Sequence, residues 1–305
     1  MRSMKVSLCL ISYNQEKFIE EAIEGVLNQD YNNLEIIISD DCSTDNTYSI
    51  IEKIVSKYKG GKKVQINRNK TNLGLVKHVN KVIEFATGDI ILLSAGDDVS
   101  LCDRASNTVK YFEENETLQA VAFSTQNIDA EGKVIGENAT NQDIIFSRNS
   151  PNYLMSCNMV TPGFGLAFRK SIFDEFGPLN DDCQTEDSTI RFRCILRGNV
   201  IYSAQKGLLY RIHGNNISAP VRIYNLRTEK IAKQFRSDLD KCRSFVTEEE
   251  YSILNLKIDY YKTYRCISEK IYNSSNKIVK SIFFLKRKWY TYQYHQKLNQ
   301  YLSKI

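Results

Sequence analysis

The chain has 305 residues, of which 42% are hydrophobic and 25% are charged, and its formal net charge is +5. This length suits one large α/β domain with an appendage, or two domains, and the composition is that of a globular protein. The apolar run at residues 6–11 is too short for a secretory signal, and no stretch has the roughly eighteen apolar residues of a membrane span. We therefore expect neither a secreted precursor nor a transmembrane protein.

Eight cysteines are scattered along the chain, and none of them forms a Cys-x-x-Cys pair. In the absence of a secretory signal they are expected to be reduced thiols, mostly buried. The cysteine pattern therefore predicts a cytoplasmic protein.

Charge is distributed unevenly along the chain. Residues 1–220 carry 23 Lys and Arg against 28 Asp and Glu, whereas residues 221–305 carry 18 against 8, so the net charges are −5 and +10. Such a split predicts two parts with different partners. We place their boundary near Pro220, with an α/β domain over residues 1–220 and a basic helical region over residues 221–305.

Short apolar runs alternate with helical periodicity in the first third of the chain. Strands are expected at residues 6–11, 34–39, 64–66 and 90–93, with three helices between them. Asn14 is the expected N-cap of the first helix, and Ser43 or Asp45 that of the second. Four strand–helix alternations with short loops predict a mainly parallel sheet.

The middle of the chain mixes further strands and helices. Asp103 is expected to cap a helix that runs to about residue 115, and the turn at residues 129–132 should join two antiparallel strands. Further strands are expected at residues 120–124, 163–169, 200–202 and 208–212, and further helices at residues 171–176 and from residue 187 to 196. From Val221 onward the pattern is helical throughout.

Pairs of aspartates follow two of the expected strands, as Asp40-Asp41 and Asp97-Asp98. The carboxyl ends of parallel strands open toward one crevice, so both pairs should meet there, beside residues 12–14. Adjacent carboxylates repel each other, and a divalent metal that carries phosphate oxygens would relieve that repulsion. The alternative for each pair is a structural one, as a solvated turn or a helix cap.

These segments resemble the family 2 glycosyltransferases with the GT-A fold. The matching segments are residues 6–14 (VSLCLISYN), 38–47 (ISDDCSTDNT), 72–74 (NLG), 88–98 (GDIILLSAGDD), 185–187 (TED) and 210–216 (YRIHGNN), with Gln29 and Asn80. The order of the motifs makes the resemblance specific for the family, although not for the sugar. It implies an α/β, Rossmann-like fold with a mixed, mainly parallel sheet flanked by helices, followed here by a C-terminal helical extension.

The resemblance also implies an activity. It is the inverting transfer of a sugar from a nucleotide-diphosphate donor, usually a UDP-sugar, to a saccharide or lipid-linked acceptor, in the synthesis of a surface polysaccharide. The implied nucleotide-binding residues are Ser12, Tyr13, Asn14, Asp41, Asn72 and Asp97. Asp98 and Asp97 would bind Mn²⁺ or Mg²⁺, and His213 would be a third metal ligand or a phosphate contact. Asp187 would be the catalytic base, with Glu186 beside it in the catalytic motif.

Several of these assignments have alternatives. His213 could be a core or capping residue, and Asp187 could serve as a helix N-cap. The family's acidic turn usually has an acid two positions before Asp97, and this chain has Ala95 there, which makes metal dependence less secure. A catalytically inactive sugar-nucleotide binder therefore remains an alternative. A nucleotidyltransferase fits less well, because residues 12–14 replace the Gly-rich phosphate loop expected after its first strand.

The basic C-terminal region carries an apolar stripe at helical spacing, formed by Ile278, Ile282, Leu285, Trp289 and Tyr292. Together with the nearby lysines it fits an anionic membrane surface, which would make the protein peripheral on the inner face of the membrane. Packing on the catalytic domain or in a homodimer is the alternative. Nucleic-acid binding is not expected, because no recognised fold or stacking motif accompanies the charge.

Overall fold

The computed structural model describes residues 3–156, 164–181, 183, 185–214, 216 and 227–303. The chain divides into two compact units that alternate along the sequence. Unit 1 comprises Met1–Ile145, Pro162–Asp181 and Gly198–His213, and unit 2 comprises Phe146–Thr161, Asp182–Arg197 and Gly214–Ile305. The predicted boundary at Pro220 lies outside the described residues and stays a prediction.

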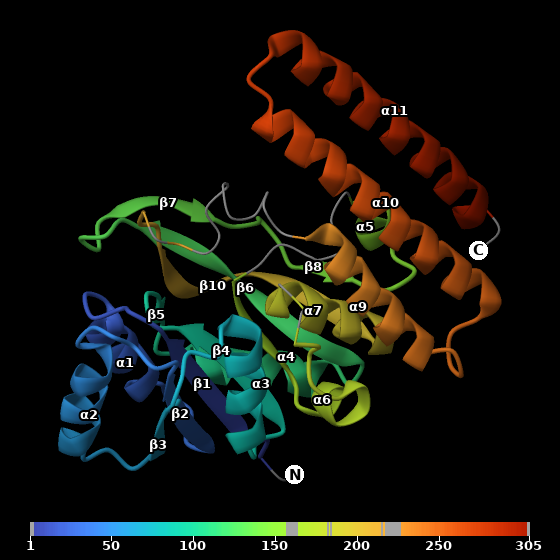
Figure 1. The fold of residues 1–305 in the computed structure, drawn as a ribbon. Coiled ribbons are helices and arrows are strands. Elements are labelled where there is room, and N and C mark those ends of the chain that lie inside the picture. The colour runs from blue at the N-terminus through green and yellow to red at the C-terminus, as the bar shows by residue number, and fades with distance from the viewer. Residues whose placement is uncertain are drawn as a thin grey trace. The chain divides into compact units, whose positions relative to one another are not determined.

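Unit 1 is built on one mixed sheet (Figure 1). Its strands are β1 (Val6–Ser12), β2 (Leu34–Asp40), β3 (Lys63–Arg68), β4 (Ile90–Ala95), β5 (Val99–Ser100), β6 (Leu118–Ile128), β7 (Val134–Asn138), β8 (Ile144–Phe146), β9 (Phe164–Arg169) and β10 (Asn199–Arg211). Their order is β3-β2-β1-β4-β9-β6-β10-β5, with β7 beside β6 and β8 beside β10. The first four strands are mutually parallel, and β9 is antiparallel to both β4 and β6. The predicted sheet is confirmed.

One expected pair of strands is in fact a single strand. The segments expected at residues 200–202 and 208–212 belong to β10, whose register with β6 shifts on both sides of Lys206. The irregularity places the polar residues Gln205 and Lys206 in solvent, so the apolar pattern is interrupted although the strand continues. The expected antiparallel pair around residues 129–132 is confirmed as β6 and β7.

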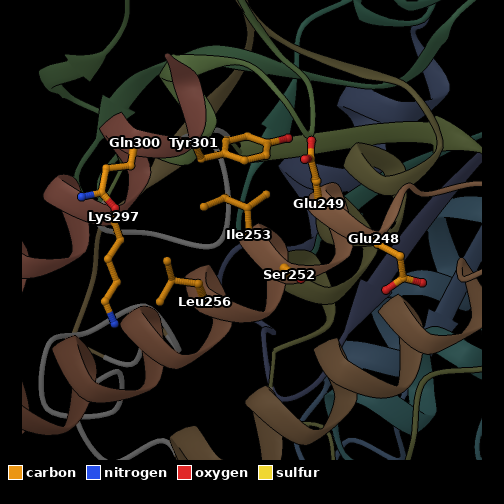
Figure 2. Close-up of a pocket in the computed structure, with 8 residues that line it drawn as sticks. All are labelled: Glu248, Glu249, Ser252, Ile253, Leu256, Lys297, Gln300 and Tyr301. Carbon is orange, nitrogen blue, oxygen red and sulfur yellow. The ribbon is translucent and has the colours of Figure 1, made fainter. Parts of the chain in front are cut away.

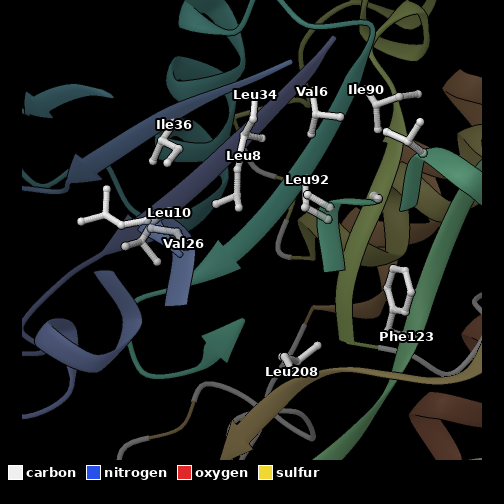
Figure 3. Packing of buried hydrophobic residues seen from close by; sticks show 14 of the residues in the cluster. Val6, Leu8, Leu10, Val26, Leu34, Ile36, Ile90, Leu92, Phe123 and Leu208 are labelled. Carbon is white, nitrogen blue, oxygen red and sulfur yellow. The ribbon is translucent and has the colours of Figure 1, made fainter. Parts of the chain in front are cut away.

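The core of unit 1 follows the two-residue alternation of its strands. Val6, Leu8 and Leu10 of β1 lie on one face with Leu34 and Ile36 of β2, packed against the helices α1, α2 and α4 (Figure 3). The helices of unit 1 are α1 (Ile19–Leu27), α2 (Thr47–Lys57), α3 (Leu75–Phe85), α4 (Arg104–Glu114) and α6 (Ser171–Phe176). Helix α3 contacts β1 and β2 and lies outside that core cluster.

The expected helix caps are confirmed only in part. Asn14 has a positive φ of 52° and accepts a hydrogen bond from the backbone N–H of Thr44 at 2.9 Å, so it fastens one loop to another instead of capping α1. Ser43 donates its hydroxyl to Asp40, and Asp45 accepts from the backbone N–H of Thr47, the first residue of α2. Asp103 occupies the N-cap position of α4 without a capping hydrogen bond. A contact between distant loops has therefore replaced the cap expected from Asn14, whereas Asp45 bonds the first N–H of α2 and Asp103 holds its expected N-cap position.

Unit 2 is helical in its described parts, as expected for the C-terminal region. Its helices are α5 (Pro151–Leu154), α7 (Glu186–Arg197), α9 (Thr228–Lys241), α10 (Glu248–Asn273) and α11 (Lys277–Leu302). Helices α7 and α9 are joined by a fully buried ion pair between Arg193 and Asp238, with Nε–Oδ2 at 2.9 Å. Helices α10 and α11 form an antiparallel hairpin in which Tyr260 and Tyr294 stack with ring centroids 4.0 Å apart (Figure 1). None of the described helices has the length and hydropathy of a membrane span.

Candidate active site

The topology of unit 1 changes direction at β1. The chain proceeds from β1 to β2 and β3 on one side, and then returns to place β4 on the other side. Ser12 is in register with Asp40 of β2, and Ile11 is in register with Ala95 of β4. The loop after β1 therefore lies between the two acidic turns, at the kind of switch point where open α/β sheets bind ligands.

The predicted nucleotide-binding residues of the β1 loop differ in exposure. Ser12 is buried and donates to the Ser39 carbonyl at 3.3 Å. Tyr13 is 44% exposed, so part of its side chain is accessible to a ligand on which it could stack. Asn14 is exposed and keeps the loop in contact with the segment after β2, because its backbone N–H donates to Ser43.

Asp41 holds the loop that precedes α3. Its Oδ1 accepts from the Asn69 side chain at 2.8 Å and from the Leu73 backbone N–H at 2.9 Å, and its Oδ2 accepts from the Gly74 backbone N–H at 2.9 Å. Asn72 closes the same turn by accepting from Gly74, whose φ of +78° suits glycine. Asp41 is thus engaged by three protein donors, and its proposed contact with a nucleotide base would have to use the remaining acceptor capacity of the carboxylate.

The turn after β4 brings two carboxyl groups together in partial burial. Asp98 is only 7% exposed, and its Oδ1 accepts from the Arg211 backbone N–H at 2.9 Å. Burial, with a further contribution from the negative charge of Asp97, raises the pKa of the Asp98 carboxyl well above its usual range. Asp97 lies 3.1 Å from Nε2 of His213 through its Oδ2. The nearby charges of Arg104 and Arg211 oppose the rise in the pKa of Asp98 only in part, so the ionised form of the Asp98 carboxyl is disfavoured in the protein alone.

Arg211 organises this turn. Its fully buried guanidinium donates to the Asp97 carbonyl at 3.0 Å, to the carbonyls of Asp129 and Ala130, and to the Glu21 carboxylate at 2.7 Å. These bonds tie β10 to the acidic turn, to α1 and to the β6–β7 turn. The sequence placed Arg211 in a matching motif but suggested no role for it. Only the tertiary contacts reveal that it is a positioning residue.

A second buried cation lies near Asp98. Arg104 of α4 is fully buried, donates to the Leu93 carbonyl and the Ser100 hydroxyl, and has an Nε without a hydrogen-bond partner. Burial lowers the pKa of Arg104 to about 10, and the charge of Asp98 opposes that shift. Sequence reasoning missed this residue, because a lone arginine at the start of a helix carries no distinguishing pattern.

The fit of a divalent cation can be judged from the donors present. Within the described ranges, no three His, Cys, Asp or Glu side chains lie together as a metal-binding group. The two carboxyl groups of Asp97 and Asp98 are hard oxygen donors whose mutual repulsion a cation would relieve. They suit Mn²⁺ or Mg²⁺ only if the diphosphate of a nucleotide supplies further oxygens. His213 contacts Asp97 and, through its ring, Phe18, with centroids 4.8 Å apart.

His78 has a structural role. Its side chain is buried with Nε2 2.7 Å from the Ser39 hydroxyl, and burial lowers the pKa of the imidazole. Lys77 pairs with Asp181 at 3.1 Å in an exposed position.

The predicted catalytic residues Glu186 and Asp187 occupy the first turn of α7, in unit 2. Asp187 has a 47% exposed side chain and forms an ion pair with the buried Arg191 one turn later. Burial and the neighbouring Asp187 raise the pKa of Glu186 to about 8. An N-cap role for Asp187 does not apply, since it lies inside the helix. Because the acidic turns belong to unit 1, the convergence of Asp187 on them stays a prediction.

A pocket of about 370 Å³ lies elsewhere, between the start of α10 and the end of α11 (Figure 2). Its lining residues are Glu248, Glu249, Ser252, Ile253, Leu256, Lys297, Gln300 and Tyr301. None of the predicted site residues is among them.

Comparison with known sequences identifies relatives of the chain. The sequence profile described as Glycosyl transferase family 2 matches residues 7–177. An uncharacterized glycosyltransferase of Haemophilus influenzae is 28% identical over 292 residues, which are 92% of this chain and 84% of the relative. Chondroitin synthase of Pasteurella multocida is 32% identical over 130 residues, which are 43% of this chain and only 13% of that much longer protein.

Solved structures share the architecture at low sequence identity. A fragment of S. aureus TarS in complex with UDP-GlcNAc superposes with a TM-score of 0.67 and 16% identity, over 93% of this chain and 79% of the other. Mannosyltransferase PcManGT from Pyrobaculum calidifontis, in complex with GDP-Man and Mn²⁺, gives a TM-score of 0.59 and 16% identity, over 98% and 85% of the two chains. These similarities confirm the GT-A fold.

Proposed function

Because the chain belongs to glycosyl transferase family 2, we propose that it is an inverting glycosyltransferase. It moves a sugar from a UDP-sugar to a hydroxyl of a saccharide or lipid-linked acceptor. The observation that carries the proposal is the edge of the unit 1 sheet, where the β1 loop lies between Asp40-Asp41 and Asp97-Asp98. This edge offers the exposed Tyr13 and the carboxyl groups of Asp97 and Asp98, which could bind a cation.

The residues of unit 1 bind and orient the donor in this proposal. Tyr13 stacks on the base, and Ser12, Asn14, Asp41 and Asn72 form the surrounding loops, while Asp97 contacts the ribose. Asp97 and Asp98 would hold Mn²⁺ or Mg²⁺, with His213 beside them. When bound, the cation neutralises charge on the departing nucleotide diphosphate. The presence of Mn²⁺ in the PcManGT complex supports a divalent cation in the proposal.

Asp187 removes the proton from the acceptor hydroxyl in this proposal. Inversion at the anomeric carbon needs a base on the face opposite the leaving group, and an ionised carboxylate can serve. Arg191 holds the Asp187 carboxylate in one orientation through their ion pair. Glu186, with its pKa near 8, supplies a second group that exchanges protons around neutral pH.

Synthesis of a surface polysaccharide is the proposed setting. The family and the similarity to chondroitin synthase over part of the chain support it. A lipid-linked acceptor would require the enzyme to work at a membrane from the cytoplasmic side.

A panel of nucleotide sugars tests the proposal. Thermal shift with and without Mn²⁺ should identify a UDP-sugar that stabilises the protein, and the same compound should be consumed when an acceptor or water is available. Asp187→Asn should abolish transfer, with a loss of about a thousandfold or more in kcat, and leave UDP binding nearly unchanged. Asp103→Asn, at an exposed aspartate of unit 1, is the matched control and should retain both properties.

One observation favours a second candidate, a catalytically inactive sugar-nucleotide binder. Ala95 stands at a position where the family usually has an acid, so one oxygen donor is missing from the turn. Such a protein would bind UDP but neither transfer nor hydrolyse any donor, and Asp187→Asn would change nothing measurable.

A further inference from the structure

Helix α11 has two apolar faces, and only one of them is covered. Val279, Phe283, Tyr290, Tyr294 and Leu298 are partly or fully buried. At about 100° per residue they occupy an arc of about 100°, and Tyr294 stacks on Tyr260 of α10. This face forms the inner side of the hairpin.

The second apolar face lies roughly opposite. It is the α11 stripe, whose five members are Ile278 (72% exposed), Ile282 (58%), Leu285 (66%), Trp289 (61%) and Tyr292 (58%). On the same helical wheel the stripe spans about 80°. The described residues of unit 2 leave this stripe uncovered. A continuous exposed stripe of large apolar side chains marks a surface that binds something.

Lysines border the α11 stripe on both sides. Lys286 lies about 40° beyond one edge of the stripe and Lys288 about 40° beyond the other. Both side chains are exposed, and neither forms an ion pair with any described residue. Their aliphatic stems can extend along the stripe while the ammonium groups reach a negatively charged layer above it.

The surrounding sequence contains no acidic side chain that could neutralise these lysines. From Lys270 to the C-terminus there are eight basic residues and no acidic residue. If two copies met through the α11 stripe, Lys286 and Lys288 of one copy would lie near the same lysines of the other. Helix α11 has no carboxylate that could pair with them. Self-association of this face would therefore be opposed by like charges, whereas an anionic surface would be attracted.

We propose that the α11 stripe docks unit 2 onto the surface of an anionic lipid bilayer. Ile278, Ile282 and Leu285 enter the boundary between headgroups and acyl chains. Trp289 and Tyr292 occupy the interface, where amphipathic aromatic rings are favoured. Lys286 and Lys288 pair with lipid phosphates. Docking is independent of the transfer reaction, because every residue involved lies in α11.

Trp289 provides a direct probe, since it is the only tryptophan in the chain. The full chain is titrated with vesicles of phosphatidylcholine alone, and with vesicles that contain 30–40% (about one-third) phosphatidylglycerol. With the anionic vesicles, Trp289 emission should shift to the blue and the protein should co-sediment. Binding to phosphatidylcholine should be weaker by about tenfold or more, and added salt should weaken the anionic binding.

Variants separate the contribution of the apolar side chains from that of the lysines. Leu285→Ser with Ile282→Ser should abolish the shift, and Lys286→Glu with Lys288→Glu should weaken binding by about tenfold or more. Lys53→Glu with Lys57→Glu, at exposed lysines of α2, is the charge-matched control and should bind within about twofold of the parent. All three variants change exposed side chains, so their circular dichroism melts should match that of the parent.

Two results would overturn the proposal. One is equal binding to neutral and anionic vesicles, or binding to neither. The other is a Trp289 emission that is already blue-shifted without vesicles and reverts on dilution, because this would assign the α11 stripe to a second copy of the chain.

Discussion

At the scale of single residues, the site depends on carboxyl groups whose surroundings oppose their ionisation. Asp98 is buried beside Asp97, and its one described hydrogen bond, from the Arg211 backbone, only partly offsets the cost of burying its charge. Glu186 lies beside Asp187 in the first turn of α7. In their ionised form such groups lower the free energy of unfolding of the protein alone, but they can bind a cation or accept a proton during a reaction.

The substitution Asp98→Asn tests the first of these groups. The amide oxygen can still accept from the Arg211 backbone N–H, while the repulsion with Asp97 is removed. The free energy of unfolding of the protein alone should rise by about 1 kcal/mol at pH 8 and change little at about pH 3, where the carboxyl is largely protonated in both the folded and the unfolded state. Mn²⁺-dependent transfer should fall at least about a hundredfold. Chemical denaturation at the two pH values provides the measurement, and a loss of stability at pH 8 would contradict the expectation.

Glu186 makes stability depend on pH in a direction that can be worked out. Its pKa is about 8 in the folded protein and about 4.5 when unfolded, so the folded state holds the proton more tightly. Stability from this group is fully present below pH 4.5 and declines as the pH rises toward 8. In Glu186→Gln, the loss in the free energy of unfolding as the pH rises should be smaller than in the parent by on the order of 1 kcal/mol, a figure that allows for solvent screening. Denaturation midpoints between pH 5 and 8 measure it, and parallel curves for variant and parent would contradict the assignment.

At the scale of elements, the acidic turn is held in place by β10, a single strand whose sequence pattern predicts two separate strands. Arg211 is the last residue of β10. Its guanidinium forms hydrogen bonds to the acidic turn, to α1 and to the β6–β7 turn. A buried guanidinium with several acceptors cannot be replaced by an ammonium group without leaving some of those acceptors unpaired.

Arg211→Lys should therefore destabilise unit 1 by about 2–4 kcal/mol and weaken UDP binding. Lys206→Met is the matched control on the same strand. It removes only the exposed pair with Glu137, which should cost less than about 1 kcal/mol. Thermal unfolding followed by isothermal titration with UDP measures both effects. Equal stability of the two variants would show that the Arg211 contacts contribute little.

At the scale of the whole molecule, charge divides the protein between an acidic α/β part and a basic helical part. In the proposed function the acidic part needs a cation before it accepts a nucleotide diphosphate, because its own carboxylates would otherwise repel the phosphates. The basic part has the opposite preference and suits an anionic surface.

Chelation gives a test at this scale. EDTA should abolish sugar transfer, and Mn²⁺ should restore it. With UDP present, the increase in melting temperature caused by Mn²⁺ should grow from pH 5 to pH 8, because cation binding competes with the proton on Asp98. Transfer that continues unchanged after chelation would remove the cation from the mechanism.

Local pattern was sufficient for most of the fold. The four parallel strands, the helices between them, the β6–β7 pair and the helical C-terminal region are encoded in periodicities that neighbouring residues carry. The family follows from motifs in a fixed order along the chain. The positions of Tyr13, Asp97 and Asp98 at one edge follow from the rule that parallel strands end together.

Tertiary structure decided what depends on contacts between distant residues. Periodicity assigns a face to a side chain but cannot say what will cover that face, so the burial of His78 and the exposure of the α11 stripe were not readable from sequence. The hydrogen bonds of Arg211 bring together groups from α1, the turn after β4 and the β6–β7 turn, which are more than eighty positions away from it in the chain. Such hydrogen bonds depend on the whole tertiary structure, because packing determines which acceptors lie within reach of a buried donor.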